Sequence, residues 1–376
     1  MHFDSSTLRE LGWSSFFDEQ FGAHAAAGLV PARVAVEHRG AYVIYGESSE
    51  LVAELAGKMQ GDYVRHDPGK LKFAPRVAAR LPAIGDWIAA SVRTDEGRAT
   101  IHATLPRRTQ FSRKQPWNPT EEQVLAANID TVFVVSALTE ASDVHDPPNL
   151  RRLERFLSMA HESGARPVVL LTKADLRSDA PEQASALAVL GVDVVLTSAL
   201  AQEGLASLEP YLAPGQTAAL IGSSGAGKST LINAILGADL LATKDVRRDG
   251  VGRHTTSRRE LVRLPAGGLV VDTPGLREIQ LWDSGDGVAG AFADIDALAS
   301  SCRFRDCGHV SEPGCAVTGA METGALDPAR LKSLRKLQRE LAHLERKQGG
   351  RGALERRHMY RSLARAARQR RGKPAS

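Results

Sequence analysis

Residues 222–229 read GSSGAGKS and match the phosphate-loop pattern G-x-x-x-x-G-K-[ST]. The loop follows an apolar stretch at 217–221 and precedes a helical stretch that stops at Gly237, so it predicts a strand, a tight turn and a helix in that order. Glycines let the backbone curl until its amides face phosphate oxygens, aided by the helix N-terminus. Lys228 is expected to reach the β- and γ-phosphates and act in catalysis, and the Ser229 hydroxyl to bind Mg²⁺. The expected phosphate-binding set is Gly222, Ser223, Ser224, Gly225, Ala226, Gly227, Lys228, Ser229 and Thr230.

Apolar strands alternate with helices around this loop. Continuous apolar runs separated by helices are typical of a mostly parallel sheet covered on both faces, so the centre of the chain is predicted to be an α/β unit. The predicted strands are 130–135, 167–171, 193–197, 217–221, 260–264 and 268–272, and the predicted helices are 149–163 and 228–236.

A phosphate loop alone does not separate ATP from GTP, but two further elements do. Thr172, Lys173, Ala174 and Asp175 follow the strand at 167–171 and resemble the [NT]-K-x-D element of GTPases. The Asp175 carboxylate is expected to accept from the guanine N1–H and exocyclic amine, and Lys173 to lie along the base. Ser198 and Ala199 follow the next strand and match the accompanying S-A element. Thr172 departs from the commoner Asn, which predicts a slightly looser contact with the base.

The remaining nucleotide elements lie after the phosphate loop. Asp272 and Gly275 fit D-x-x-G, with Asp272 holding Mg²⁺ through water and Gly275 sensing the γ-phosphate. Residues 252–256 resemble switch I; Thr256 is assigned to Mg²⁺, with Thr255 as the alternative. Leu276 stands where a water-orienting Gln is usual, which predicts slow intrinsic hydrolysis. His254 either replaces that Gln as a catalytic residue or only contacts backbone.

The order of these elements is inverted. The base-reading elements precede the phosphate loop, the switch and D-x-x-G, whereas in ordinary GTPases they come last. Joining the old termini and opening new ones preserves the same sheet, because the termini of a domain often lie close together. The order therefore indicates a circularly permuted GTPase.

The first third of the chain has a different pattern. A short helical lead and a small-residue linker at 23–31 precede strands predicted at 33–37, 41–45, 86–92 and 98–105. Several short strands in so few residues predict a small barrel, and an OB-like barrel would suit RNA binding.

All three cysteines of the chain fall close together, as Cys302-x4-Cys307-x-His309-x5-Cys315. Three thiolates and one imidazole fill a closed tetrahedral site, so the set Cys302, Cys307, His309 and Cys315 predicts one structural Zn²⁺ per chain.

Charge is concentrated at the C-terminus. Residues 329–376 hold 16 Lys and Arg against 3 Asp and Glu in a chain of net charge +4, a pattern typical of a polyanion-binding arm. The three cysteines are too few for a disulfide framework, no apolar run is long enough to cross a membrane, and the start lacks a secretory signal. We therefore expect a cytoplasmic protein with no membrane partner.

The barrel, the permuted G domain and the C-x4-C-x-H-x5-C segment followed by a basic helix together resemble the RsgA (YjeQ) family of small-ribosomal-subunit biogenesis GTPases. The resemblance implies a monomer that binds GTP and GDP and the 30S subunit with its rRNA. It also implies slow GTP hydrolysis stimulated by the subunit, help in late 30S maturation, and release on hydrolysis. Two alternatives stay open: a permuted GTPase of large-subunit assembly, and a non-hydrolysing RNA-binding adaptor with a degenerate G domain.

The expected architecture is multidomain, with an OB-like β-barrel, a permuted α/β P-loop GTPase domain and a zinc-binding domain with basic helices. The expected division is an N-terminal extension at 1–30, the barrel at 31–110, the G domain at 113–278, the zinc-binding domain and helix at 279–348, and a basic tail at 349–376.

Overall fold

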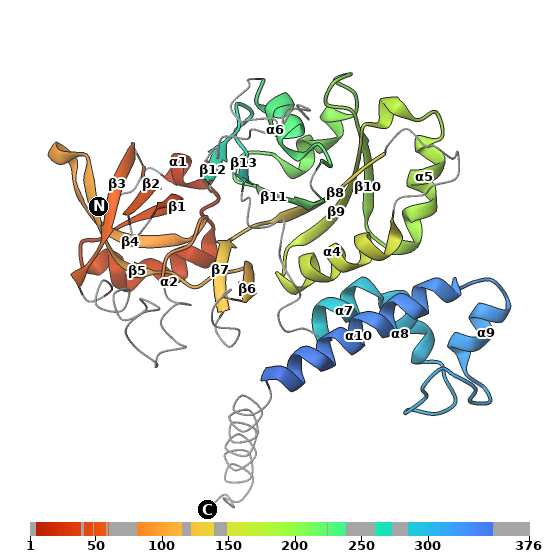
Figure 1. Ribbon diagram of the computed structural model, residues 1–376. Helices are drawn as coiled ribbons and strands as arrows, with labels where there is room; N and C mark the ends of the chain where they lie inside the picture. Colours follow the sequence, from red (N-terminus) through yellow and green to blue (C-terminus); the bar gives the residue numbers. More distant parts are fainter. Residues whose placement is uncertain are drawn as a thin grey trace, which may run out of the picture.

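Three units follow one another along the chain in a computed structural model (Figure 1). The N-terminal unit is a barrel with two helices, the central unit is an α/β sandwich, and the C-terminal unit is helical. The structure describes residues 5–38, 41–47, 49–57, 59, 81–114, 122–138, 149–223, 225–237, 260–272 and 285–348.

The N-terminal sheet closes on itself. Strand β1 (Val30–His38) pairs with both β2 (Ala41–Tyr45) and β4 (Trp87–Arg93), and the order around the barrel is β1-β2-β3-β5-β4. Strands β3 (Glu50–Leu55) and β5 (Arg98–Thr104) run parallel, while the other neighbours in the barrel run antiparallel. Strand β3 alternates exposed and buried residues along its length, as a strand with one face on a core must. The predicted small barrel is confirmed, and it has five strands.

Two helices precede the barrel and pack on it. They are α1 (Ser5–Glu10) and α2 (Ser15–Ala26). The ring centroids of Trp13 and Trp87 lie 4.7 Å apart, and the rings of Phe17 and Phe21 both contact Trp13. The predicted linker at 23–31 is wrong for its first residues, because the alanines there continue α2 until the left-handed turn at Gly28.

The central sheet has the predicted alternation of strands and helices. Its strand order is β10-β9-β8-β11-β13-β12, and its strands run parallel except for β12, which is antiparallel to β13. Its strands are β8 (Thr131–Ala137), β9 (Arg166–Thr172), β10 (Asp193–Thr197), β11 (Thr217–Gly222), β12 (Glu260–Arg263) and β13 (Leu269–Asp272). Its helices are α4 (Leu150–Glu162), α5 (Ala180–Ala186) and α6 (Lys228–Leu236), with 3-10 turns η3 (Ala174–Leu176), η4 (Leu187–Leu190) and η5 (Leu205–Tyr211).

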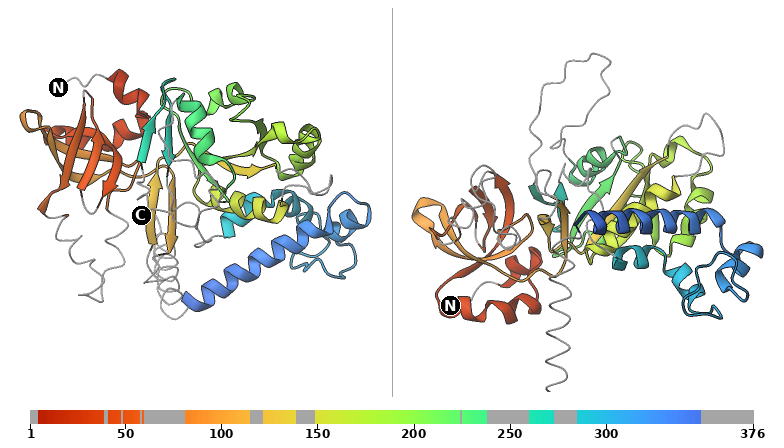
Figure 2. Two further views of the ribbon diagram at one scale, coloured as in Figure 1. Left: turned by 45° about the horizontal axis from the view of Figure 1, so that its top comes forward. Right: turned by 60° about the horizontal axis from the view of Figure 1, so that its bottom comes forward.

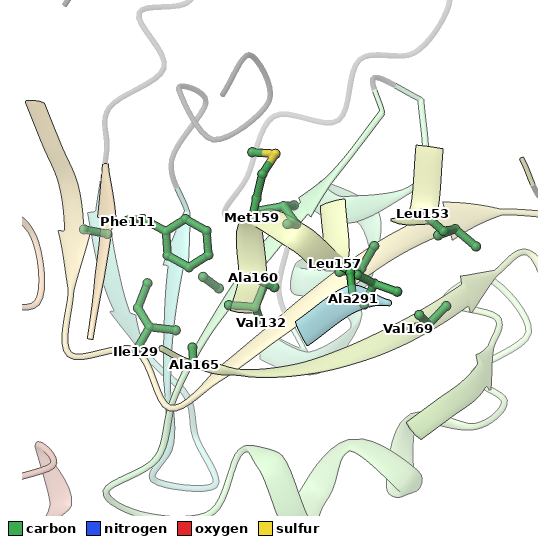
Figure 3. Close-up of a cluster of buried hydrophobic side chains, with 14 of the residues drawn as sticks. Phe111, Ile129, Val132, Leu153, Leu157, Met159, Ala160, Ala165, Val169 and Ala291 are labelled. Carbon is green, nitrogen blue, oxygen red and sulfur yellow. The ribbon is translucent and has the colours of Figure 1, made fainter. Parts of the chain in front are cut away.

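Each face of this sheet has its own core. Val132 of β8 and Val169 of β9 point to the side covered by α4, where Leu153 and Leu157 of that helix cover them (Figure 3). The residues next to them along the strands belong to the opposite core with Leu231 of α6. This alternation places the two valines on one face and their neighbours on the other. The loops at the carboxyl ends of the strands are thus held by two buried layers.

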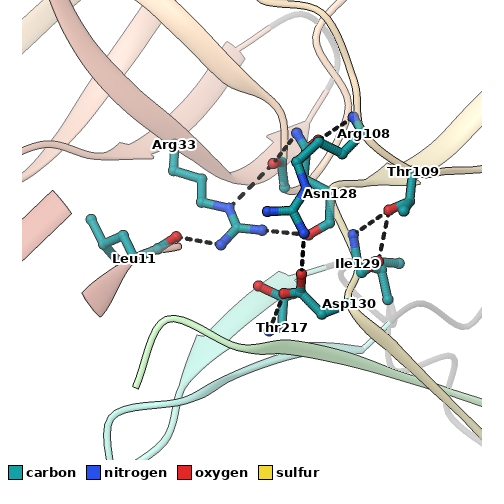
Figure 4. Close-up of polar contacts among 9 residues, drawn as sticks. Leu11, Arg33, Arg108, Thr109, Asn128, Ile129, Asp130 and Thr217 are labelled. Atoms are coloured by element: carbon teal, nitrogen blue, oxygen red, sulfur yellow. Dashed lines mark hydrogen bonds and ion pairs between the residues drawn. The ribbon is translucent and has the colours of Figure 1, made fainter. Parts of the chain in front are cut away.

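A polar junction joins the barrel to the central unit (Figure 4). The buried guanidinium of Arg33 donates to the carbonyls of Leu11, Gly85 and Asn128, which belong to the helical lead, the barrel and the start of the α/β unit. Burial lowers the pKa of Arg33 to about 10, so it remains charged at neutral pH. Strand β1 also pairs with β12, which makes one sheet of the two units. A hairpin of β6 (Gln110–Lys114) and β7 (Glu122–Ala127) lies between them.

The C-terminal unit contains four helices in the described part of the chain. They are α7 (Gly285–Ala291), α8 (Ala293–Ala299), α9 (Ala316–Glu322) and α10 (Pro328–Gln348). The sequence predicted α10 but not the other three, since each is only two turns long and α7 and α9 contain glycine. Gly287 lets α7 approach α4, because a Cβ there would lie 2.3 Å from the Ser158 carbonyl oxygen. The long α10 extends past the other helices of the unit (Figure 2). None of the described helices is both long and apolar enough to cross a membrane.

Candidate functional site

The phosphate-loop residues lie at the carboxyl end of β11 and lead into α6. Gly222 has φ +148°, and a Cβ there would lie 2.2 Å from the Val135 carbonyl oxygen, so only glycine fits beside β8. Gly227 takes a left-handed conformation and caps α6. The Lys228 ammonium donates to the carbonyls of Gly222 at 2.8 Å and Ser223 at 2.6 Å. These bonds hold the ammonium at the loop, where a phosphate group would meet it.

The predicted base-reading element meets the phosphate loop across 54 residues of sequence. The Thr172 hydroxyl donates to the Ala226 carbonyl at 2.7 Å, and the Thr172 side chain is buried. The sequence predicted that a threonine here would loosen contact with the base. That looser contact stays a prediction. The structure shows that the Thr172 hydroxyl links the two loops through its bond to the Ala226 carbonyl. Lys173, which is predicted to lie along the base, takes a left-handed backbone conformation that turns the chain into η3.

Asp175 and Ser198 complete this edge of the sheet. Asp175 lies in η3 with its side chain exposed, as a group that binds a ligand from outside must. Ser198 is buried, and its hydroxyl accepts from the Ala201 amide at 3.0 Å in a tight turn. Gly204 closes the turn, because a Cβ there would lie 2.0 Å from the Leu196 carbonyl oxygen. Gly204 is not among the predicted site residues, although a glycine soon after an S-A element is a visible signal in the sequence.

Several predicted site residues lie outside the described residues. These are Ser224, His254, Thr255, Thr256, Gly275 and Leu276, while Asp272 is described only as the end of β13. Their assigned roles remain predictions.

One basic residue near the loop was not predicted. Arg152 lies in the first turn of α4, and its guanidinium donates to the Ser223 hydroxyl at 3.0 Å. The helix start is fixed by the Asn149 side chain, which accepts from the Arg152 amide. No local motif marks this arginine, because its partner is 71 residues away.

The four predicted metal ligands come together in the segment between α8 and α9. Their ligand atoms all lie within 4.8 Å of one another. The Sγ atoms of Cys302 and Cys315 are 3.9 Å apart, and His309 Nδ1 lies 3.6 Å from the first and 3.5 Å from the second. A tetrahedral zinc with bonds of about 2.3 Å to sulfur and 2.0 Å to nitrogen gives edges of about 3.8 Å and 3.5 Å. The spacing fits a metal ion.

Neighbouring groups shape this cluster. The Glu312 carboxylate accepts from the amides of Val310, Gly308 and Ser311, and these bonds lower its pKa to about 2. The Cys315 thiol caps α9 and accepts from the Thr318 amide at 3.3 Å. Burial opposes ionisation of this thiol, but its hydrogen bonds with Thr318 and His309 favour the thiolate and lower the pKa of Cys315 to about 6. A low thiol pKa favours metal binding, which requires the thiolate.

Helix α10 also contacts the loop that carries His309. Arg335 donates to the carbonyls of Gly308 at 3.0 Å and His309 at 2.9 Å. The Cys/His cluster is therefore linked to the long basic helix.

Residues 104–282 match the model of the family described as RsgA GTPase. The chain is 45% identical over 353 residues to the small ribosomal subunit biogenesis GTPase RsgA of Opitutus terrae, covering 91% of each chain. It is 42% identical to the protein of the same name from Streptomyces coelicolor, covering 96% of this chain and 93% of the relative.

Two solved structures share the fold. The crystal structure of YjeQ from Thermotoga maritima has a TM-score of 0.60 at 23% identity, covering 84% of this chain and 99% of that one. YloQ, described as a circularly permuted GTPase, has a TM-score of 0.58 at 23% identity, covering 84% and 96%.

Proposed function

The chain belongs to the RsgA family of GTPases, and on that premise we propose that it hydrolyses GTP while bound to the small (30S) ribosomal subunit. In this proposal it assists late maturation of the subunit, hydrolyses GTP slowly when alone, and leaves the subunit on hydrolysis. The relatives' names, small ribosomal subunit biogenesis GTPase, support the partner.

One contact carries the proposal most directly. The Thr172 hydroxyl bonds to the Ala226 carbonyl, so the base-reading element and the phosphate loop form one edge of the sheet despite their inverted order. Ligands of open α/β sheets bind beyond the carboxyl ends of the strands, which is where both loops lie.

The roles of the site residues follow from their types and places. Asp175 would read the guanine, with Thr172, Lys173, Ala174, Ser198 and Ala199 around the base, and residues 222–230 with Gly275 would surround the phosphates. Lys228 would stabilise charge on the β- and γ-phosphates. Ser229, Asp272 and Thr256 would hold Mg²⁺, which neutralises phosphate charge when bound. His254 would orient the attacking water or contact backbone only.

The cysteine cluster is proposed to hold one structural Zn²⁺ through Cys302, Cys307, His309 and Cys315. A closed set of four protein ligands leaves no position for a substrate, so the metal would stabilise the C-terminal unit. Metal analysis should give about one zinc per chain, and Cys307→Ser should lose it. A metal-free preparation of unchanged stability would contradict the assignment.

We further propose the domain division given by the sequence, with the barrel at 31–110, the G domain at 113–278 and the zinc-binding domain at 279–348. Trp13 and Phe17 pack on Trp87 of the barrel, so residues 1–30 and the barrel would fold together. We also propose that the protein acts in the cytoplasm as a monomer.

The decisive experiment measures GTP hydrolysis with and without purified 30S subunits. Stimulation by 30S subunits but not by 50S subunits is expected, together with tighter 30S binding in the presence of a non-hydrolysable GTP analogue than with GDP. Lys228→Ala and Ser229→Ala should abolish hydrolysis without unfolding the chain, since each removes a group that acts on phosphate or metal. Stimulation by 50S subunits instead would indicate large-subunit assembly, and RNA binding without hydrolysis would indicate an adaptor.

A further inference from the structure

Two basic side chains approach the phosphate loop at the same residue. Lys228 donates to the Ser223 carbonyl, and Arg152 donates to the Ser223 hydroxyl. The lysine belongs to the loop motif, but the arginine comes from α4. Among the described residues, Arg152 has no carboxylate partner, although its neighbours Glu154 and Arg155 both form ion pairs.

Arg152 also stands on a rigid support. The Asn149 side chain caps α4 at the Arg152 amide, and Leu153 and Leu157 are buried against the sheet (Figure 3). Strand β8, which leads towards α4, pairs in parallel with β11, with Val135 opposite Gly222. The start of α4 and the phosphate loop therefore lie at the same edge of the sheet, where the nucleotide would bind.

We propose that Arg152 is a catalytic residue that binds the terminal phosphate of GTP and stabilises the charge of the transition state. This inference rests on the proposed GTPase function. A guanidinium offers several N–H donors in a planar fork that matches phosphate oxygens, and its charge does not depend on pH in the physiological range. With Leu276 in place of a polar residue after D-x-x-G, the site would gain from a cation supplied by the same chain.

The reaction itself needs no bond to Arg152. Water oxygen bonds to the γ-phosphorus, and the bond from that phosphorus to the β–γ bridging oxygen breaks, with its electron pair remaining on GDP. The products are GDP, inorganic phosphate and one proton. Arg152 exchanges the Ser223 hydroxyl for an oxygen of the transferring phosphoryl group, where negative charge is spread in the transition state.

The test compares Arg152→Ala and Arg152→Lys with Arg151→Ala, a matched control at the adjacent exposed arginine of the same helix. Single-turnover hydrolysis with 30S subunits is measured together with the affinities for GDP, for a GTP analogue, and for GDP with aluminium fluoride. Arg152→Ala should slow hydrolysis by about 100-fold or more and lose binding of the fluoride mimic, with GDP affinity unchanged. Arg152→Lys should recover part of the rate, because it keeps the charge but not the fork. Arg151→Ala should behave as the native chain.

Hydrolysis by Arg152→Ala at the rate of Arg151→Ala would overturn the inference. An equal loss of GDP and GTP-analogue affinity, with an unchanged rate per bound GTP, would also overturn it, because Arg152 would then only brace the loop. Either result leaves the proposed function intact as long as the native chain hydrolyses GTP. A native chain with no hydrolysis would overturn the function first.

Discussion

At the residue scale, Thr172 and Asp175 stand three positions apart in the predicted base-reading element, but their side chains have different surroundings. Thr172 is buried and bonds to the phosphate loop, whereas Asp175 is exposed at the carboxyl end of the sheet. A change at Thr172 would therefore alter the loop for every nucleotide. A change at Asp175 would alter only the choice of base.

Asp175→Asn should lower GTP affinity by roughly 100-fold or more and raise preference for xanthosine triphosphate. The amide presents a donor where the carboxylate presented an acceptor, so it no longer matches the guanine N1–H and amine but does match a carbonyl at that edge. Nucleotide affinities measured by fluorescence titration would check this. The control is Glu182→Gln, an exposed acid-to-amide change in the nearby α5, which should leave both affinities as they were. Unchanged GTP preference in Asp175→Asn would rule out this residue as the base reader.

At the element scale, α4 is the helix that joins the central and C-terminal units. Arg330 of α10 bonds to Glu154 of α4 at 2.9 Å and to Asp294 of α8 at 2.7 Å, and it lies over the ring of Phe292. Glu154 and Arg330 are almost fully buried. Burial raises the pKa of Glu154 although Arg330 opposes the rise.

Arg330→Ala should reduce the free energy of unfolding by about 3–5 kcal/mol at pH 8, since it leaves the Glu154 carboxylate buried without its counterion. Because the folded-state pKa of Glu154 is raised above its unfolded value, its contribution to stability is complete below the unfolded pKa. That contribution is lost as pH rises through the folded pKa. Without Arg330 the folded-state pKa of Glu154 rises further. The decrease in the free energy of unfolding caused by Arg330→Ala should therefore be smaller at pH 5 than at pH 8, and urea unfolding at both pH values measures this decrease.

The matched control for this prediction joins the same two helices. Arg155 of α4 pairs with Glu340 of α10, but both side chains are about one-third exposed, at 38% and 33%. Arg155→Ala should therefore cost no more than about 1 kcal/mol and show little pH dependence. Equal losses for Arg330→Ala at pH 5 and pH 8 would show that Glu154 ionisation does not limit the stability of this unit.

At the scale of the whole molecule, the barrel and the central unit share one sheet, and the basic charge lies at the far end of the chain. The Tyr45 hydroxyl donates to the Leu261 carbonyl at 3.0 Å, which adds to the β1–β12 pairing. On the C-terminal side, Lys332, Lys336 and Arg339 are exposed along α10. The arm after Gly349 lies outside the described residues.

Deleting the residues after Gly349 should flatten the salt dependence of 30S binding. Phosphate contacts release counterions, so affinity of the intact chain should fall by about ten-fold or more between about 50 and 200 mM salt. The deletion should leave basal GTP hydrolysis unchanged, because no nucleotide motif lies in it. It removes Arg351, Arg356, Arg357, Arg361, Arg365, Arg368, Arg370, Arg371 and Lys373. Titrations of 30S binding at several salt concentrations measure the slope, and an unchanged slope would mean that the arm makes no phosphate contacts.

Local pattern was enough to predict much of this protein. Continuous apolar runs separated by helical stretches predicted the central strands closely, and β10 and α6 span the predicted residues. The short helices of the C-terminal unit were harder to predict, because α7, α8 and α9 are only two turns long and depend on tertiary packing: α7 packs on α4, and α8 packs on α9.

The sequence by itself determined the order of the nucleotide motifs, the four-residue metal set and the barrel followed by an α/β unit. Each of these features depends on residue types at short, fixed spacing. The turn of a phosphate loop, the spacing of metal ligands and the apolar pattern of a strand are all set by residues close together in the sequence. Only the tertiary structure decided which distant groups meet: Thr172 with Ala226, Arg152 with Ser223, and Arg330 with Glu154. Such partners lie 54, 71 and 176 residues apart, and no local pattern encodes the fold that brings them within hydrogen-bonding distance.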